Sequence, residues 1–405
     1  MRPVLHKIFS VPLLAFFLVA CHSDKDQVKA FPAPRFHEAP KQLGSIDITY
    51  ADSTAPGWQP VKSSLDSFYK LQVNRGFNGS VLIGHNGKIL YERYFGMANR
   101  EAQIPWSPKT ASQLASTSKT ITASAILYLY EHKYLDIDAE VSTYIKGFPY
   151  QGVTVRMLLN HRSGLPDYTH WAVAYIKDEK IPITNDDLLD LIRKVKPKLL
   201  FKPNTHFKYS NTNFALLASI IESVTERKYP VFLQEFIFNP LGMTHTFVFD
   251  ANKGFPPNTA MSYKYNWVRE PIMFADGIYG DKGIYSTVED MYKWDQSFYQ
   301  DKLLNNETME LAYGPCSFEK KGIKNYGLGW RMLCYPDGYK IIYHNGWWHG
   351  NNTCFYRFIK DNFTVIVLGN KFNNSIYHQP QAVYSIVNGA AADSAHGGAG
   401  NEGAE

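Results

Sequence analysis

Apolar residues recur along this chain with two different periods, and each period predicts a different kind of element. In residues 58–75 they fall at helical spacing, which favours an amphipathic helix that ends at Arg75-Gly76. Residues 79–96 read as two strands around the turn pair Asn86-Gly87, which indicates a hairpin. A helix followed by a hairpin therefore opens the folded part of the chain.

The middle of the chain is patterned for helices, with no strong strand signal between about residues 112 and 240. Residues 113–130 read as a polar turn that runs into a long apolar helix. Further helices are expected within residues 185–226, interrupted at Pro197, and over about 229–238. We therefore expect an all-helical insertion here.

Strand patterns return in the last third of the chain, and a final helix over about residues 379–387 closes the fold. The order of elements predicts an α+β fold, in which an antiparallel sheet flanked by helices is split in sequence by the helical insertion. We place the domain at residues 57–388, with its α/β part at about 57–110 and 280–388 and its helical part at about 111–279. The expected strands lie at residues 283–285, 327–332, 339–343, 353–358 and 364–368.

Residues 1–20 have the features of a secretory signal peptide. Arg2 and Lys7 precede an apolar run over residues 8–20 that is too short for an ordinary transmembrane helix. The run ends in Leu18-Val19-Ala20-Cys21, which resembles the lipobox of bacterial lipoproteins, where the cysteine carries the lipid. A plain cleaved signal with a chance cysteine is the alternative. A lipidated Cys21 would anchor the protein in the bacterial cell envelope, on the periplasmic face or the outer-membrane surface.

Composition and charge narrow the classes of function. The 405 residues are 45% hydrophobic and 20% charged, which is typical of a globular protein. Without Arg2 and Lys7, the chain has 40 basic and 37 acidic residues. This net charge of +3 is too small to indicate a nucleic-acid partner, and we expect none. Residues 21–56 hold prolines and charges without sustained periodicity and are expected to form a tether, whereas residues 389–405 are expected to be disordered.

The remaining cysteines and the histidines give no argument for a metal or another cofactor. Past Cys21, the three residues Cys316, Cys334 and Cys354 allow at most one disulfide and lack the spacing of a zinc site. No His-Glu-x-x-His motif occurs in the chain. We therefore expect no metal and no cofactor.

Candidate chemistry begins at Ser116 and Lys119, where the polar turn meets the apolar helix. Side chains three residues apart lie on one face of a helix, and the apolar run that follows would strip water from the ammonium and favour its neutral form. Lys119 could then activate Ser116 as a nucleophile. Ser-x-x-Lys also occurs at Ser67 and at Ser317, so the spacing alone leaves open an ordinary helix-capping serine.

Two further segments support a catalytic role. Tyr209-Ser210-Asn211 precedes an apolar helix. A tyrosine near a lysine could take part in proton transfer between the nucleophile and the leaving group. The Asn211 amide could hold both the lysine and a substrate carbonyl. His344-Asn345-Gly346 follows the predicted strand at 339–343, and Gly346 would let a substrate approach it closely. The N–H groups of Trp347 and Ser116 could then form an oxyanion hole.

Ser116-Thr-Ser-Lys119, Tyr209-Ser-Asn211 and His344-Asn-Gly346, in this order, resemble the motifs of the serine β-lactamase and penicillin-binding-protein superfamily. Tyrosine in the second motif and histidine in the third look like the branch of class C β-lactamases, D,D-carboxypeptidases, D-aminopeptidases and esterases. Supporting segments at residues 158–168 and 326–330 are similar too. The resemblance covers about residues 58–388 and implies a β-lactamase/transpeptidase-like fold.

The resemblance implies that Ser116 is acylated, that Lys119 is its base and that Tyr209 protonates the leaving group and activates water. Asn211 and the strand from His344 to Trp347 would bind a small-molecule or peptide substrate. Many relatives have lysine in place of His344, which puts β-lactam hydrolysis in doubt and makes an esterase or D-amino-acid peptidase the stronger expectation. A catalytically silent peptidoglycan- or peptide-binding lipoprotein of the same fold is the alternative.

Overall fold

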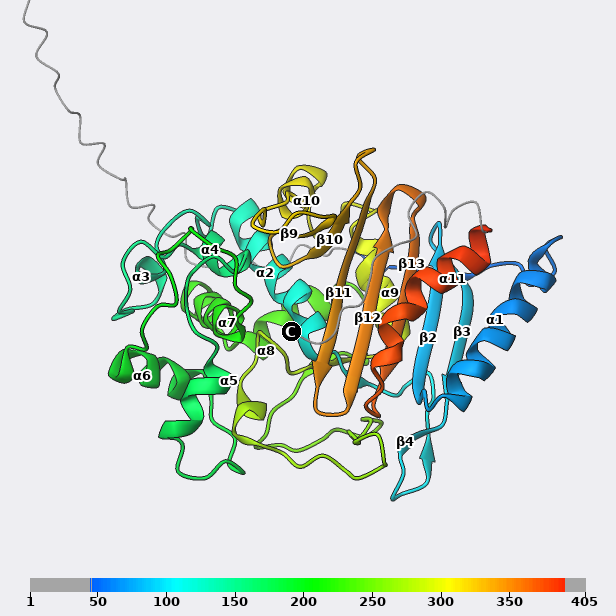
Figure 1. The fold of residues 1–405 in the computed structure, drawn as a ribbon, viewed down its shortest axis with the longest axis horizontal. Coiled ribbons are helices and arrows are strands. Elements are labelled where there is room, and N and C mark those ends of the chain that lie inside the picture. The colour runs from blue at the N-terminus through cyan, green and yellow to red at the C-terminus, as the bar shows by residue number, and fades with distance from the viewer. Residues whose placement is uncertain (1–43, 45, 390–405) are drawn as a thin grey trace, which may run out of the picture. The chain divides into compact units, whose positions relative to one another are not determined.

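The computed structural model describes residues 44 and 46–389. The signal peptide, Cys21, most of the expected tether and the tail from residue 390 lie outside these described residues. Within them, one eight-stranded sheet has the strand order β1-β3-β2-β13-β12-β11-β10-β9 (Figure 1). The bounds are β1 Thr49–Tyr50, β2 Gly79–His85, β3 Lys88–Phe95, β9 Lys324–Tyr326, β10 Arg331–Cys334, β11 Lys340–Trp348, β12 Asn351–Phe358 and β13 Phe363–Gly369.

Alternation along the central strands builds two apolar layers, one on each face of this sheet. On β13, Val365 and Val367 join the layer beneath α1 and α11, whereas Ile366 and Leu368 point into the larger core on the other face. Figure 1 shows α11 crossing β12 and β13, with α1 beside β3 and α9 behind the sheet. These covering helices are α1 Trp58–Asn74, α9 Val288–Ser297, α10 Asn306–Ala312 and α11 Gln379–Asn388.

The helical part packs around two buried helices, α2 (Ser118–Glu131) and α7 (Asn211–Thr225), which contact each other. Both are buried along nearly their whole length, as expected of helices enclosed by others. Their neighbours are η1 Ala115–Thr117, α3 Val141–Tyr144, α4 Val155–Leu159, α5 Tyr168–Trp171, η2 Ala172–Tyr175, α6 Asn185–Val195, α8 Tyr229–Leu233 and η3 Gln234–Phe238.

The α+β fold predicted from the sequence is confirmed, with most of its elements. The sheet is antiparallel except where β1 pairs parallel with β3, and the part expected to be all-helical also holds two short strands, Ser112–Gln113 and Phe247–Val248. The helix at 58–75 is α1, and the hairpin turns at Asn86-Gly87, whose φ values of 50° and 77° suit the tight turn predicted there. The final helix is α11. No helix among the described residues is long and apolar enough to cross a membrane.

Three strand predictions need correction. Residues 327–330 form a turn in which the Gly327 N–H donates to the Trp330 carbonyl, so β10 begins only at Arg331. The strand at 283–285 belongs to a separate small sheet of β6 (Ser112–Gln113), β8 (Ile284–Ser286) and β7 (Phe247–Val248). The strand predicted at 339–343 continues as β11 to Trp348, because it keeps pairing with β12 through the polar and glycine positions that end its apolar pattern.

Candidate active site

Ser116 sits at the turn that leads into α2. All residues from 111 to 129 are buried except Ser116, which is partly exposed. The residue before it, Ala115, has a left-handed φ of 49°, an uncommon conformation for a side chain with a Cβ. The N–H of Leu114 donates to the carbonyl of Ile284 in the small sheet and helps to hold this turn. The turn thus presents one hydroxyl at the surface of an otherwise buried segment.

Lys119 is fully buried, one helical turn after Ser116. Its Nζ lies 3.0 Å from Ser116 Oγ, 2.8 Å from Asn211 Oδ1 and 2.8 Å from the Asp281 carbonyl oxygen. Two of these partners can only accept hydrogen bonds, whereas the hydroxyl can also donate. Lys119 Nζ is therefore within hydrogen-bond reach of the one hydroxyl in this set, the group whose proton an amine base could accept.

Asn211 begins α7, and its amide is oriented by Asp167. Asp167 Oδ2 accepts from both the backbone N–H and the side-chain Nδ2 of Asn211, at 2.8 and 2.9 Å. Because the NH₂ group is engaged by this carboxylate, the amide oxygen faces Lys119. Asp167 also caps α5 by accepting the N–H of Thr169 at 3.0 Å. One carboxylate therefore joins α5, α7 and the catalytic candidate on α2.

Tyr209 lies between two basic side chains. Lys119 Nζ is 4.9 Å and the guanidinium carbon of Arg331 is 5.3 Å from the centroid of its ring. The imidazole of His161 lies beneath it, with ring centroids 4.4 Å apart. Tyr209 is partly exposed, as are Ser116 and Asn211. The structure thus brings the four residues predicted from the helical part, Ser116, Lys119, Tyr209 and Asn211, to one place.

Strand β11 supplies the opposite wall. A Cβ at Gly346 would lie 2.3 Å from the Leu114 carbonyl oxygen and 3.1 Å from the Ala115 Cβ, so only glycine lets the strand come this close to the Ser116 turn. Pairing with β10 ends at Tyr343, which leaves residues 344–348 on an open strand edge among the described strands. Main-chain groups on such an edge can pair with an extended ligand.

The residues that flank Gly346 point in different directions. Trp347 has 48% of its surface exposed, and its indole N–H donates to the His349 carbonyl at 2.9 Å. Asn345 Nδ2 lies 3.4 Å from the Tyr356 hydroxyl, so its side chain contacts β12 rather than the Ser116 turn. Trp348 is anchored by Asp276, which accepts its indole N–H at 2.6 Å. The side chains of Asn345, Trp347 and Trp348 therefore contact β12, His349 and Asp276 rather than the Ser116 turn.

His344 is fully buried within β11 and is hydrogen-bonded at both nitrogens. Its Nδ1 lies 2.7 Å from the Asn345 carbonyl oxygen, which can only accept, so Nδ1 carries the proton. Nε2 then accepts from the Tyr326 hydroxyl at 3.3 Å. Burial, with the nearby charge of Arg331, lowers the pKa of His344 well below 6.5. His344 is thus neutral at neutral pH.

Five residues of this site were missed by sequence reasoning, and most of them lie in the segments that we had noted only as supporting ones. Arg331 follows the segment at 326–330 directly, so adjacency to that segment was the available signal. It places a permanent positive charge beside Tyr209 and within electrostatic range of His344. The missed residues are His161, Asp167, Tyr168, Tyr326 and Arg331.

Comparison with known proteins places the chain in a family. The sequence profile of the family described as Beta-lactamase matches residues 71–384. The chain belongs to the β-lactamase family. Penicillin-binding protein 4* of Bacillus subtilis (strain 168) is 35% identical over 328 residues, which cover 77% of this chain and 72% of that protein. The predicted resemblance is thereby confirmed.

Hydrolases stand among the other relatives in this family. The D-aminopeptidase of Brucella anthropi is 29% identical over 283 residues, which cover 66% of this chain and 51% of that enzyme. The crystal structure of D-amino acid amidase from Ochrobactrum anthropi SV3 shares the fold, with a TM-score of 0.69 at 21% identity over 81% of this chain and 98% of that one. The chain is therefore a member of a serine hydrolase family.

Proposed function

We propose that this protein hydrolyses an ester or amide bond through a covalent acyl-enzyme on Ser116. The observation that carries the proposal is the set of three contacts at Lys119 Nζ, two to pure acceptors and one to the Ser116 hydroxyl at 3.0 Å. A buried amine with its donors already engaged offers its lone pair to the only partner that can give up a proton. Lys119 is the general base in this proposal.

The reaction proceeds in two halves. Ser116 Oγ attacks the substrate carbonyl carbon while its proton moves to Lys119 Nζ, and the N–H groups of Ser116 and Trp347 hold the developing oxyanion. Tyr209 relays a proton to the leaving alcohol or amine as its bond to the carbonyl carbon breaks. Water then attacks the acyl-enzyme and gives a proton to Tyr209 or Lys119, which passes it to Ser116 Oγ as the bond to the acyl carbon breaks and the acid leaves.

The substrate class that fits is an extended peptide or ester with a D-amino acid at the cleaved bond. The open edge of β11 can pair with the acyl part of such a chain. Arg331 can pair with a carboxylate on the leaving group, a role that the neutral His344 does not fill. The relatives named D-aminopeptidase and D-amino acid amidase support this choice. An esterase or D-amino-acid peptidase is thus favoured over a β-lactamase.

The test compares wild type with Ser116→Ala on p-nitrophenyl esters, D-alanyl peptides and nitrocefin. We expect ester or peptide hydrolysis by the wild type and a loss of at least about a thousandfold in kcat/KM for the variant. Ser67→Ala is the matched control, because Ser67 belongs to another Ser-x-x-Lys sequence and is exposed on α1. Hydrolysis that survives Ser116→Ala would refute the proposal.

A fluorescent penicillin or fluorophosphonate separates hydrolysis from simple binding. With the fluorescent penicillin, rapid turnover of the label on Ser116 indicates a hydrolase, and a persistent label indicates acylation without efficient deacylation. The fluorophosphonate labels a reactive Ser116 stably and so reports only whether the nucleophile is active. No label on a folded protein would favour the silent binding protein instead.

We further propose that Cys21 is lipidated and anchors the protein in the bacterial cell envelope. The motif at residues 18–21 and the charged and apolar residues before it support this. The full-length protein should incorporate an alkyne fatty acid during growth and fractionate with membranes. The Cys21→Ala variant should do neither, and incorporation that persists in this variant would refute the anchor.

A further inference from the structure

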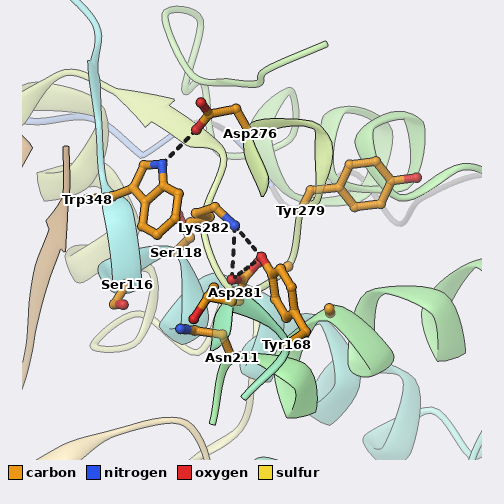
Figure 2. A network of polar contacts seen from close by, with 12 residues as sticks. Ser116, Ser118, Tyr168, Asn211, Asp276, Tyr279, Asp281, Lys282 and Trp348 are labelled. Atoms are coloured by element: carbon orange, nitrogen blue, oxygen red, sulfur yellow. Dashed lines mark hydrogen bonds and ion pairs between the residues drawn. The ribbon is translucent and has the colours of Figure 1, made fainter. Parts of the chain in front are cut away.

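Behind the Ser116 site, a buried ion pair is held by a buried phenol. Lys282 Nζ lies 3.2 Å from Asp281 Oδ2 and also donates to the Tyr168 hydroxyl, which itself donates to Asp281 Oδ2 at 2.9 Å. Figure 2 shows Lys282 directed at these two partners. Lys282 Nζ also lies 4.6 Å from the ring centroid of Trp348, the last residue of β11. Lys282 has 3% and Asp281 1% of its surface exposed.

The Asp281 carboxylate depends on this pair for compensation. Its Oδ1 is buried and has no hydrogen-bond partner among the described residues, so Lys282 and Tyr168 act on Oδ2 alone. Burial raises the pKa of Tyr168 well above 10, and the negative charge of Asp281 raises it further, so this residue stays a neutral phenol. Lys282 therefore supplies the formal charge that balances the Asp281 carboxylate.

Asp281 also touches the proposed base. Its main-chain carbonyl oxygen accepts from Lys119 Nζ at 2.8 Å, and the carboxylate of the same residue is only a few covalent bonds away. At this range in a buried region, an unbalanced negative charge would strongly favour the protonated form of Lys119. A protonated Lys119 could not accept the proton of Ser116.

We propose that Lys282 is a positioning residue whose ammonium neutralises the Asp281 carboxylate and so lets Lys119 exist as the neutral base. Lys282 also fixes the segment that presents the Asp281 carbonyl to Lys119. The inference rests on the proposed hydrolytic function and deepens it, because it identifies what controls the protonation of the base.

The other groups that act on Lys119 differ in kind from this pair. From α7 and the loop before it come the uncharged amide of Asn211 and the phenol of Tyr209. From β10 and β11 come the guanidinium of Arg331 and the neutral imidazole of His344. The loop between α4 and α5 adds a second buried imidazole and a carboxylate that is engaged by Asn211. These groups are Asn211, Tyr209, Arg331, His344, His161 and Asp167. Among the described residues, none of these six is hydrogen-bonded or ion-paired to Asp281, whose polar contacts are with Lys119, Tyr168 and Lys282, so the charge on Asp281 and Lys282 can be changed without removing a bond to them.

The test measures kcat/KM against pH for Asp281→Asn, Lys282→Met and the double variant, with a neutral p-nitrophenyl ester as substrate. Lys282→Met leaves an unbalanced carboxylate, so the acid limb of the profile should move to higher pH by about one unit. Asp281→Asn leaves an unbalanced ammonium and should move the acid limb the other way. The double variant removes both charges and should return toward wild type.

Two controls separate this role from loss of structure. Lys293→Met removes another lysine that pairs with a buried aspartate, Asp290, at 3.2 Å on α9, and should lower stability without moving the acid limb. Lys282→Arg keeps the charge and should keep the wild-type limb. If Lys282→Met fails to fold, Asp281→Asn and the double variant still give a signed comparison.

Superimposable acid limbs in Asp281→Asn, Lys282→Met and wild type would overturn the inference, even if all rates fell. That outcome leaves the proposed function intact, provided that wild-type hydrolysis still requires Ser116. Where ester turnover is slow, the rate of Ser116 labelling by a fluorophosphonate against pH gives the same readout. A wild type with neither hydrolysis nor labelling would refute the function and this inference together.

Discussion

The Tyr326 hydroxyl donates to Nε2 of His344 at 3.3 Å, and the same oxygen lies 3.2 Å from Nε2 of His161. His161 Nδ1 accepts from the N–H of Ser210 and from Asn213, so its proton is on Nε2 and points to Tyr326. The hydrogen bonds therefore run in one direction, from His161 through Tyr326 to His344. This chain of buried groups connects the helical part to β11 directly beneath Tyr209.

The first prediction concerns stability against pH. Burial, with a smaller contribution from the nearby charge of Arg331, lowers the pKa values of His161 and His344 well below 6.5. When the pH falls below about 6.5, these histidines take up protons in the unfolded chain but not in the folded protein. The free energy of unfolding should therefore decrease with falling pH, by about 1.4 kcal/mol per pH unit for each histidine.

Urea unfolding between pH 5 and 7 measures this decrease. The His161→Gln and His344→Gln variants should each show a shallower dependence on pH than wild type. His206→Gln, which changes an exposed histidine, is the control and should keep the wild-type slope. A free energy of unfolding that is constant across this range would contradict the prediction.

The second prediction concerns substrate charge. Arg331→Met should lower kcat/KM about tenfold to a hundredfold for substrates whose leaving group carries a carboxylate, because the variant loses a charge-assisted contact. Neutral esters should be nearly unaffected. Steady-state kinetics on a matched peptide acid and peptide amide measure the difference. Lys340→Met is the control, since Lys340 on β11 donates to the Tyr313 carbonyl at 3.0 Å and not toward the site. Equal losses on both substrates would argue for a structural role of Arg331.

The third prediction concerns the contact between β11 and the Ser116 turn. In Gly346→Ala, the new methyl group would lie 2.3 Å from the Leu114 carbonyl oxygen and from Thr353 Oγ1, so the strand must move. We expect about 1–3 kcal/mol of destabilisation and a larger loss in kcat than a stability change alone explains. Thermal unfolding and kinetics on the same sample measure both effects. Gly314→Ala, where the nearest atom is 3.2 Å away, is the milder control.

Sequence patterns predicted the elements that repeat and the motifs that keep a fixed local spacing. The helix α1, the hairpin at Asn86-Gly87 and the Ser116–Lys119 pair all carry such a signal. Two-residue strands such as β6 and β7 have no measurable period, so they were not predicted. The end of β11 was missed because its main chain, not its side chains, continues the pairing past Gly346.

The supporting contacts of the site could not be predicted for a different reason. Asp167 meets Asn211 across 44 positions and Asp281 meets Lys119 across 162, so no local pattern links the partners. Each of these residues is also an ordinary cap or loop residue in its own segment. Only the packing of α2 on α7 and on the small sheet brings them together.

The last prediction follows from the orientation of Asn211. In Asp167→Asn, the oxygen that accepts from the Asn211 backbone and side chain is replaced by an NH₂ group, or the α5 cap is lost if the new amide turns round. Either arrangement loses one acceptor, because only a carboxylate has an acceptor oxygen both for the Asn211 contacts and for the α5 cap. The Asn211 amide can then rotate and present NH₂ to Lys119, which loses one of its two pure acceptors.

We expect Asp167→Asn to lower kcat about tenfold to a hundredfold with a smaller change in KM, because the base is displaced while the β11 edge is unchanged. Thr169→Ala is the matched control: it removes the 2.7 Å hydrogen bond to the other oxygen of Asp167 and leaves the Asn211 contacts in place. Kinetics on a neutral ester, with thermal unfolding of both variants, make the comparison. If Thr169→Ala lost as much activity as Asp167→Asn, the carboxylate would act only by capping α5, and its role in holding Asn211 toward Lys119 would be refuted.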